Sequence, residues 1–254
     1  MPVSGDFKPA ASVKKELPAP TTPAITVTPS PTPKEIQQTV IKLLPKYVTD
    51  KEGWATDIQV PFTSLNIEPS VENLCSAIAV IEQESSFVAN PRVANLPKIA
   101  LNEIYARGSK IGIPNWAINS ALSVNSKNGK TYLQRIKSAY TEGELSDIFE
   151  EMADSLPLGK SLFGSYNPIR TAGAMQVSVA FATAQVQKAP YPYPLGDDLR
   201  HELFTRRGGL YFGIAHLLDY KANYDAPIYR FADYNAGRYS SRNAAFQKAL
   251  TNAS

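Results

Sequence analysis

The sequence predicts an all-α protein, and the spacing of its apolar residues is the main reason. Along most of the 254-residue chain, apolar residues recur at the three- and four-residue spacing of a helix. No stretch keeps the alternation of apolar and polar residues that a half-buried strand shows. Hydrophobic residues make up 43% of the chain, which is enough to bury the core of one sizeable domain.

Residues 1–33 differ in composition from the rest of the chain. They hold eight of the 20 prolines, together with many Thr, Ala and Ser residues. Such a segment lacks apolar bulk and backbone donors, so it is predicted to be a disordered, extended tether that precedes a helical domain at 34–254. Tethers of this kind join a lipid anchor to a folded domain or one domain to another, and both readings stay open.

A capping-box pattern, Thr32-Pro33-Lys34-Glu35, opens the first predicted helix at 35–48. Pro45 should end or kink that helix. Ser70 is placed to cap the second helix, and Thr141-Glu-Gly-Glu144 forms another capping-box pattern. Further helices are predicted at 70–87, 96–107, 114–123, 130–140, 143–154, 178–188, 197–223, 226–235 and 238–251.

The predicted helix at 70–87 is apolar on every side over 77–81, which is typical of a helix at the buried centre of a domain. It then runs into two glutamates, Glu82 and Glu84. Ionisable groups at the end of a buried helix should have raised pKa values, as a general acid at neutral pH requires. The pattern alone favours a plainer interpretation, in which the glutamates mark where the helix meets water.

Charge and composition exclude several classes of function. The net charge of +3 is spread along the chain, and Arg206-Arg207 is its densest basic cluster, so no nucleic-acid partner is expected. The single cysteine, Cys75, excludes an internal disulfide framework and is expected to be a buried small hydrophobe. His201 and His216 are too isolated to form a metal cluster. The sequence therefore predicts neither a metal nor a cofactor.

No stretch approaches the roughly 20 apolar residues that span a bilayer. Met1–Lys15 also lacks the hydrophobic region of a secretory signal. Taken alone, these features predict a soluble cytoplasmic protein.

Four short stretches resemble, in order, the signatures of lysozyme-like soluble lytic transglycosylases and goose-type lysozymes. Residues 81–87 (IEQESSF) resemble their glutamate–serine motif, and 173–177 (GAMQV) their glycine–leucine–methionine–glutamine–isoleucine turn. Residues 232–237 (ADYNAG) are close to their alanine–tyrosine–asparagine–alanine–glycine signature. Residues 209–218 resemble the helix before it, with a glycine, an aromatic and a leucine pair. Each match alone is weak, but four in this order make the resemblance specific over about 70–245.

The resemblance implies a lysozyme-like lytic transglycosylase domain with an inserted helical segment. The connection from Glu84 to Gly173 is far longer than usual, which places the insert at about 90–165. Ala174 stands where the superfamily has leucine, and Asp233 is inserted before the tyrosine. The insert and the proline-rich start are more similar to an uncharacterised bacterial envelope lipoprotein branch. That branch implies an outer-membrane lipoprotein on the periplasmic face of the envelope, held by an N-terminal lipid anchor that is absent from this chain.

The activity that the resemblance implies is that of a peptidoglycan lytic transglycosylase. Such an enzyme cleaves the β-1,4 bond between N-acetylmuramic acid and N-acetylglucosamine (MurNAc–GlcNAc) and forms a 1,6-anhydro ring. Glu84 would protonate the leaving oxygen and then accept the proton of the C6 hydroxyl. The expected partners are peptidoglycan glycan strands, bound by a monomer. The implied substrate-binding residues are Ser85, Met175, Gln176, Tyr234 and Asn235.

Several of these residues also have a structural interpretation. Ser85 could satisfy the backbone of its own helix, and Gln176 could bond backbone groups in a buried turn. Tyr234 could be a core aromatic residue with a satisfied hydroxyl. For Asn235 a structural role near a helix end is favoured over contact with the sugar.

Glu82 is the competing acid, and a helical wheel places it on nearly the opposite face from Glu84. Periodicity alone would bury Glu82, whereas the serine that follows Glu84 favours Glu84 as the acid. A lysozyme-type hydrolase would need a second carboxylate, for which Asp219, Asp225 and Asp233 are candidates. A further alternative is a peptidoglycan-binding envelope lipoprotein with little or no catalytic activity.

Overall fold

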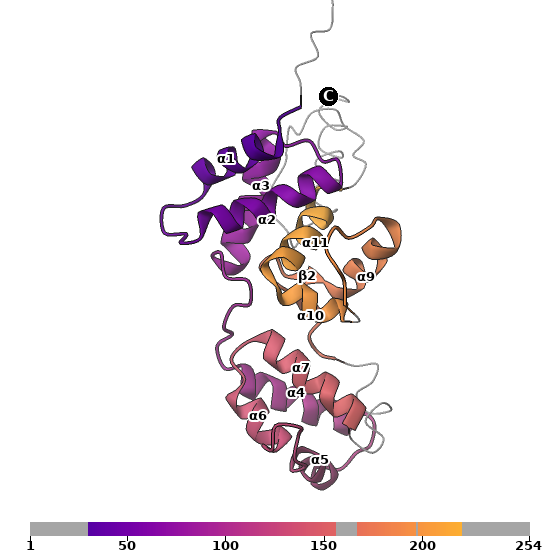
Figure 1. Cartoon of the computed structure of the whole chain (residues 1–254). Coiled ribbons are helices and arrows are strands. Elements are labelled where there is room, and N and C mark those ends of the chain that lie inside the picture. Colours follow the sequence, from indigo (N-terminus) through magenta and orange to yellow (C-terminus); the bar gives the residue numbers. More distant parts are fainter. Residues whose placement is uncertain (1–29, 156–166, 197, 220–254) are drawn as a thin grey trace, which may run out of the picture. The chain divides into compact units, whose positions relative to one another are not determined.

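A computed structural model describes residues 30–155, 167–196 and 198–219 of the chain. The described residues from Pro31 onward belong to one compact unit, and the predicted tether lies almost wholly outside the described residues. The described part is mostly helical, as the sequence predicts (Figure 1). Its elements are α1 (Pro33–Leu43), α2 (Lys51–Ser64), α3 (Val71–Ser85), α4 (Leu96–Lys110), α5 (Asn115–Leu122), α6 (Tyr132–Ser138), α7 (Glu142–Ser155), β1 (Thr171–Ala172), β2 (Val177–Ser178), α9 (Val179–Lys188), α10 (Leu199–Phe204) and α11 (Arg206–Leu218).

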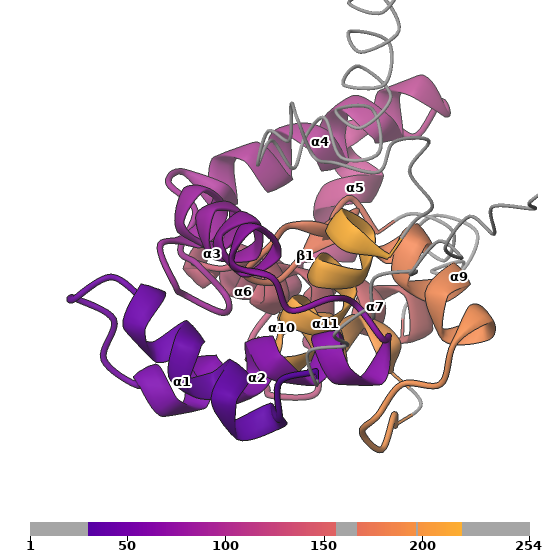
Figure 2. The same ribbon diagram turned by 90° about the horizontal axis from the view of Figure 1, so that it is seen from above.

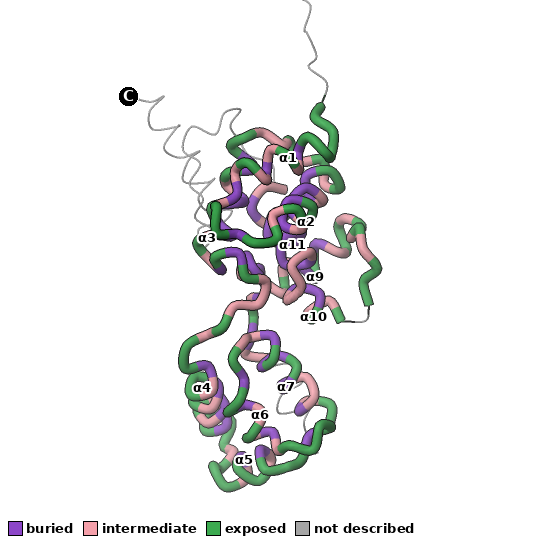
Figure 3. Tube along the Cα trace, turned by 60° about the vertical axis from the view of Figure 1, so that its left-hand side comes forward, coloured by how far each residue is buried: buried purple, intermediate pink, exposed green. Residues whose placement is uncertain are grey.

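One hydrophobic cluster joins the first three helices to the last ones described. Helix α1 packs against α2, and α2 packs against α11. Both views show α1 and α2 side by side (Figure 2). Helix α11 is buried along most of its length, so it is the central element of this cluster (Figure 3). Its neighbours contribute fully buried side chains, among them Val40, Ile58, Ile81 and Met175.

A second hydrophobic cluster is formed by helices α4, α5, α6 and α7, which belong to the predicted insert. Tyr132, Ile136 and Met152 are completely buried in it. Phe204 at the end of α10 packs against both clusters. The insert therefore buries its own apolar faces, which is what a chain segment needs if it is to fold as a stable addition.

Two predicted helix starts are confirmed in detail. Thr32 and Glu35 form the expected capping box at α1, with each side chain accepting from the other's backbone N–H. Thr141 and Glu144 do the same at the start of α7, at 3.3 and 3.1 Å. Local capping chemistry is readable from sequence because it depends on residues only three positions apart.

The sequence analysis missed helix α2. Gly53 and Pro61 lie inside it, and both residues disfavour a helix interior. The structure gives a reason for Gly53, because a Cβ there would lie 2.2 Å from the Asp50 carboxylate and 2.4 Å from the Arg206 guanidinium. The Arg206 side chain bridges to Asp57 of α2 at 2.5 Å. Packing between distant segments thus overrides local propensity.

The single helix predicted at 197–223 is wrong, because the chain turns at Thr205 and forms two helices. Thr205 ends α10, and its hydroxyl accepts from the backbone N–H of Gly208 at 3.0 Å to cap α11. The helix predicted at 35–48 ends at Leu43, two residues before Pro45. The helices predicted at 226–235 and 238–251 lie outside the described residues.

Helix α3 is not buried on every side, which corrects the expectation for its centre. Cys75 and Ala79 are exposed, whereas Leu74, Ile78 and Ile81 are buried. The expected burial of Cys75 is therefore wrong. The apolar run of α3 still supplies one face of the core, and the opposite face meets solvent.

Gly173 should tolerate no side chain, and Gly129 provides a matched control. Both have a left-handed φ, +78° and +81°, but a Cβ at Gly173 would lie 2.2 Å from the Leu203 carbonyl oxygen, and one at Gly129 meets nothing within 4 Å. We expect Gly173→Ala to cost about 3 kcal/mol and Gly129→Ala about 1 kcal/mol of unfolding free energy. Urea denaturation measures both, and equal costs would contradict the role of the close approach.

Candidate functional site

The candidate site begins at the end of α3, where Glu84 occupies the last turn and is partly exposed. Two neighbours on the same helix are buried: Ile81 is fully inaccessible and Ser85 is 8% exposed. Helix α3 is held at its start by Ser70, whose hydroxyl accepts from the backbone N–H of Asn73 at 3.3 Å. The carboxyl of Glu84 therefore lies where the buried face of a core helix reaches the surface.

The chain leaves α3 through two consecutive residues in the left-handed region. Ser86 has φ of 48° and Phe87 has φ of 60°. A bulky residue at positive φ costs free energy, so the surrounding structure must hold it in place. Phe87 is 8% exposed, and its ring packs edge-on against Trp54 at 5.1 Å between centroids. Burial of the Phe87 ring thus fixes the direction in which the helix end carrying Glu84 is presented.

The hydroxyl of Ser85 bonds within its own helix. Its Oγ donates to the carbonyl oxygen of Ile81 at 3.0 Å. In this arrangement Ser85 satisfies the helix backbone, which is the structural interpretation that the sequence left open beside substrate binding.

Glu82 is partly exposed, as Glu84 is. Its carboxylate accepts a hydrogen bond from the hydroxyl of Tyr47, at the exposed surface. This bond raises the pKa of Tyr47 to about 12, because a phenol that donates to a carboxylate is harder to ionise. Since Glu82 is paired at the surface and is not buried, the expectation from periodicity is wrong for this residue.

The second motif, 173–177, forms the turn of the β1–β2 hairpin, in which Ala172 pairs with Val177. Gly173 lies against Gly209 of α11, since a Cβ on Gly173 would be 2.9 Å from the Gly209 Cα. Met175 is fully buried and packs over Gly213, where a Cβ would be 2.5 Å from its sulfur. The structure places Met175 in the core, so it anchors the turn.

Gln176 is the polar residue of this turn, and its backbone is also left-handed, with φ of 49°. Its amide oxygen accepts from the Thr171 hydroxyl at 2.9 Å, and its amide nitrogen donates to the Glu142 carboxylate at 3.2 Å. A longer contact, 3.5 Å, joins the nitrogen to the Gly173 carbonyl. Both ends of the Gln176 amide are therefore engaged by defined partners.

Glu142 is a site residue that the sequence reasoning missed. It is half-buried at the first position of α7, and burial raises its pKa while the hydrogen bond from Gln176 opposes that rise. The Thr141–Glu144 capping box marked the helix start correctly. No sequence signal could show that this helix start faces a turn 34 residues away.

Asn90 ties this helix start to the segment that follows α3. Its Nδ2 donates to the Thr141 hydroxyl at 3.1 Å, and its Oδ1 accepts from the backbone N–H of Gly143 at 3.4 Å. The backbone of Val93 adds a bond to the Tyr140 carbonyl at 2.9 Å. The segment that begins six residues after Glu84 thus holds the helix that presents Glu142 to Gln176.

Among the remaining predicted residues, Asp219 is described and is not part of this arrangement. Asp219 accepts from Lys188 and from Gln185, both at 3.0 Å, so it is committed to a surface ion pair.

The described residues contain no cluster of three or more His, Cys, Asp or Glu side chains that could hold a metal ion. None of the described helices is long and apolar enough to cross a membrane. The remaining predicted residues lie outside the described ranges: Asp225, Asp233, Tyr234 and Asn235.

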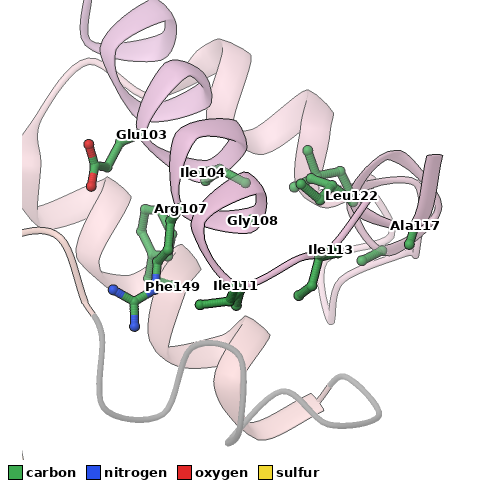
Figure 4. Close-up of a pocket in the computed structure, with 11 residues that line it drawn as sticks. Glu103, Ile104, Arg107, Gly108, Ile111, Ile113, Ala117, Leu122 and Phe149 are labelled. Carbon is green, nitrogen blue, oxygen red and sulfur yellow. The ribbon is translucent and has the colours of Figure 1, made fainter. Parts of the chain in front are cut away.

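A separate apolar pocket lies among the insert helices (Figure 4). It is lined mainly by aliphatic side chains of α4 and α5, such as Ile104 and Leu122, with Phe149 of α7. Glu103 and Arg107 are the charged residues of its lining. A saccharide site needs several hydrogen-bonding groups, so this pocket fits a saccharide less well than the polar cluster around Gln176.

Comparisons with known proteins give a family without an assigned activity. The family described as a protein of unknown function (DUF1615) matches residues 47–254. The uncharacterized protein YaiW of Escherichia coli (strain K12) is 47% identical over 220 residues, which cover 87% of this chain and 60% of that protein. The chain thus spans about three fifths of the length of this relative. No solved structure matches the chain.

The pH dependence of stability should reveal the burial of Glu142. Its pKa is raised in the folded state above the ordinary value of 4.5, so its stabilising contribution is present at low pH and is lost as the pH rises through the raised pKa. Glutamine does not ionise. We therefore expect Glu142→Gln to gain stability relative to the unmodified chain on going from pH 4 to pH 8. Thermal melts of both proteins across that range measure the difference, and a constant or falling difference would contradict the prediction.

Proposed function

The chain belongs to the DUF1615 family, and we propose that it is a peptidoglycan lytic transglycosylase with Glu84 as its general acid and base. The proposal includes a lysozyme-like lytic transglycosylase domain that carries the inserted helices. Its bond is the MurNAc–GlcNAc β-1,4 linkage, and its product ends in a 1,6-anhydro ring. One observation carries the proposal: a partly exposed glutamate ends a core helix, beside a strained exit that buried aromatic rings hold in place.

The position of Glu84 suits proton transfer at a glycosidic bond. A general acid needs solvent-side access for the substrate and an apolar flank that disfavours its charged form. Ile81 and Phe87, each three residues from Glu84, are buried apolar residues that would supply that flank, and the partial exposure of Glu84 supplies the access. Glu84 would donate its proton to the leaving oxygen, then accept the proton of the C6 hydroxyl as that oxygen closes the ring.

This reaction needs only one carboxylate because the nucleophile belongs to the substrate. Retaining and inverting hydrolases use two carboxylates at about 5–5.5 Å and 6.5–9.5 Å respectively. In the transglycosylase reaction the same group serves as acid and then as base, and the two steps leave its protonation state unchanged.

The other motif residues divide between support and binding. Met175 anchors the hairpin turn in the core, and Ser85 bonds its own helix, so in this arrangement both support the site. Gln176 presents a polar amide from a strained turn and is the described residue best suited to a saccharide hydroxyl or N-acetyl group. Tyr234 and Asn235, which lie outside the described residues, would complete the substrate-binding set.

We place the enzyme on the periplasmic face of the bacterial envelope, as a monomeric outer-membrane lipoprotein whose substrate is the glycan strand. The proline-rich composition of residues 1–33 supports this placement, because such a segment can span the distance between an anchor and a polymer.

A lysozyme-type hydrolase acting on the same polymer is the second candidate. Glu142 favours it, because a half-buried carboxyl beside the Gln176 turn offers the second acid that hydrolysis requires. The two reactions differ in their products: transglycosylation gives anhydro ends and hydrolysis gives reducing ends. A binding lipoprotein with little or no activity would give neither.

Digestion of purified peptidoglycan tests the proposal. Mass analysis of the released fragments should find 1,6-anhydro-muropeptides. Glu84→Gln should lower their release at least a hundredfold, because the amide cannot donate the catalytic proton. Glu82→Gln, which changes the surface carboxyl that Tyr47 holds, should leave the release within a few-fold of normal.

Thermal melts of both variants check that the fold is intact. Reducing ends in place of anhydro ends would favour the hydrolase, and no release of either kind would exclude both enzymes. Loss of activity in Glu82→Gln with activity kept in Glu84→Gln would show that the acid is assigned to the wrong glutamate.

A further inference from the structure

We propose that Glu142, supplied by the inserted segment, is a positioning residue that sets the orientation of the Gln176 amide for saccharide binding. This inference rests on the proposed function, because it assigns Gln176 to the sugar site. It adds a role for the insert, which would act on the site through the start of α7. Three observations support it: the partners of the amide, the anchoring of α7 and the surroundings of the Glu142 carboxyl.

The two partners of the Gln176 amide are not equivalent. The Thr171 hydroxyl can donate or accept, so it could bond either end of the amide. An ionised carboxylate only accepts, so Glu142 can bond only the nitrogen end. The Gly173 carbonyl oxygen also only accepts, but its contact with the amide nitrogen is longer, 3.5 Å against 3.2 Å for Glu142. Glu142 is therefore the main group that sets which end of the amide faces which way, and the Thr171 hydroxyl can adapt to either orientation.

The consequence for a ligand is direct. With the amide held in this orientation, its second N–H, on the nitrogen that lies 3.5 Å from the Gly173 carbonyl oxygen, and the second lone pair of its oxygen point in fixed directions. An amide free to turn over would offer a saccharide a donor and an acceptor in two alternative arrangements, and binding would have to select one of them. Fixing the arrangement before binding lowers that cost.

Glu142 is itself held firmly. Asn90 bonds both neighbours of Glu142, the Thr141 hydroxyl and the Gly143 backbone. A Cβ on Gly143 would lie 2.6 Å from the Asn90 side chain, so the two segments are in close contact. The hydrogen bonds of Asn90 thus hold the start of α7 against the segment that follows α3, and this contact sets the position of the Glu142 carboxyl.

The pKa of Glu142 is shifted by burial and by the Gln176 hydrogen bond, and no charged neighbour is among the causes. On α7, Glu144 accepts from the Tyr140 backbone, and the Arg92 guanidinium lies 4.2 Å over the Tyr140 ring. Arg170 adjoins the hairpin and is exposed. On α10, His201 lies 3.9 Å from Asp147. No ion pair among the described residues involves Glu142.

These surroundings make the orientation of Gln176 sensitive to pH. Burial raises the pKa of Glu142, so its protonation begins at a higher pH than for an exposed glutamate. A protonated carboxyl can donate as well as accept, and it then no longer excludes the turned-over amide. Saccharide affinity should therefore fall as the pH is lowered through the pKa of Glu142.

The test measures binding apart from cleavage. Calorimetric titration of a GlcNAc–MurNAc tetrasaccharide into the full chain carrying Glu84→Gln gives Kd without turnover. In that background we expect Glu142→Ala to weaken binding about tenfold at neutral pH, the effect of losing one charge-assisted hydrogen bond. We expect Glu142→Gln, which can donate or accept, to weaken binding several-fold and to remove the dependence of Kd on the pKa of Glu142.

Glu144→Gln is the matched control, since it makes the same substitution two residues away. Glutamine keeps the capping box, and Glu144 has no bond to Gln176, so Kd and its pH profile should match those of the parent. If α7 had only a structural role, the Glu142→Gln and Glu144→Gln variants would not differ in Kd or in its pH profile.

The outcomes distinguish this inference from the proposed function. If Glu142→Gln and Glu144→Gln share the Kd and pH profile of the parent, the inference is overturned, while release of anhydro-muropeptides still supports the enzyme. If the tetrasaccharide binds and responds to Glu142 while peptidoglycan is not cleaved, the inference holds and the enzymatic proposal fails. If the unmodified chain neither binds the tetrasaccharide nor cleaves peptidoglycan, both the inference and the proposed function are contradicted.

Discussion

The close backbone approach between Gly173 and Gly209 determines where the polar residues of the site can lie. A Cβ on Gly173 would be 2.9 Å from the Gly209 Cα, so the hairpin turn rests directly on α11 with no side chain between them. The same helix leaves room at Gly213 for the Met175 side chain, which fills the core beneath the turn. Because the Met175 side chain is buried in the core, the chain reverses direction at Gln176 and the Gln176 side chain lies on the other side of the turn. The left-handed backbone conformation of Gln176 is the strain that this reversal requires.

Strain is concentrated at the two motif segments. Five non-glycine residues of the described chain have a positive φ, and two of them are Asn66 and Asn95, a residue type that tolerates this region. The other three are Ser86, Phe87 and Gln176, which follow the helix end with Glu84 or form the hairpin turn. Proteins keep strained residues where the surroundings over-determine them, and such places are often functional sites. This coincidence is independent of the motif resemblance, since it comes from the backbone alone.

The features that sequence could predict depend on near neighbours in the chain. The capping boxes at Thr32 and Thr141 involve residues three positions apart, and both were predicted correctly. Helix α2 was missed because Gly53 and Pro61 lower its local propensity, while the bond from Arg206 to Asp57, 149 residues away, helps to hold it in place. Glu142 was missed for the same reason: its pairing with Gln176 depends on the packing of α7. The start of α7 could be predicted from the sequence, but the pairing of Glu142 with Gln176 could not.

The geometry of Glu142 bears on the choice between the two cleavage reactions. A hydrolase would need this carboxylate to activate water or to attack the sugar, and either task requires an oxygen that can change its partner during the reaction. Glu142 already holds the Gln176 amide through Oε2, and the only other described candidate, Asp219, is held by Lys188 and Gln185. Using the Oε2 oxygen of Glu142 as a base or nucleophile would release the amide that we assign to the substrate at the moment when the substrate must be held. A reaction in which Glu84 alone transfers the proton both ways avoids that conflict, and it leaves Glu142 free to keep Gln176 in place.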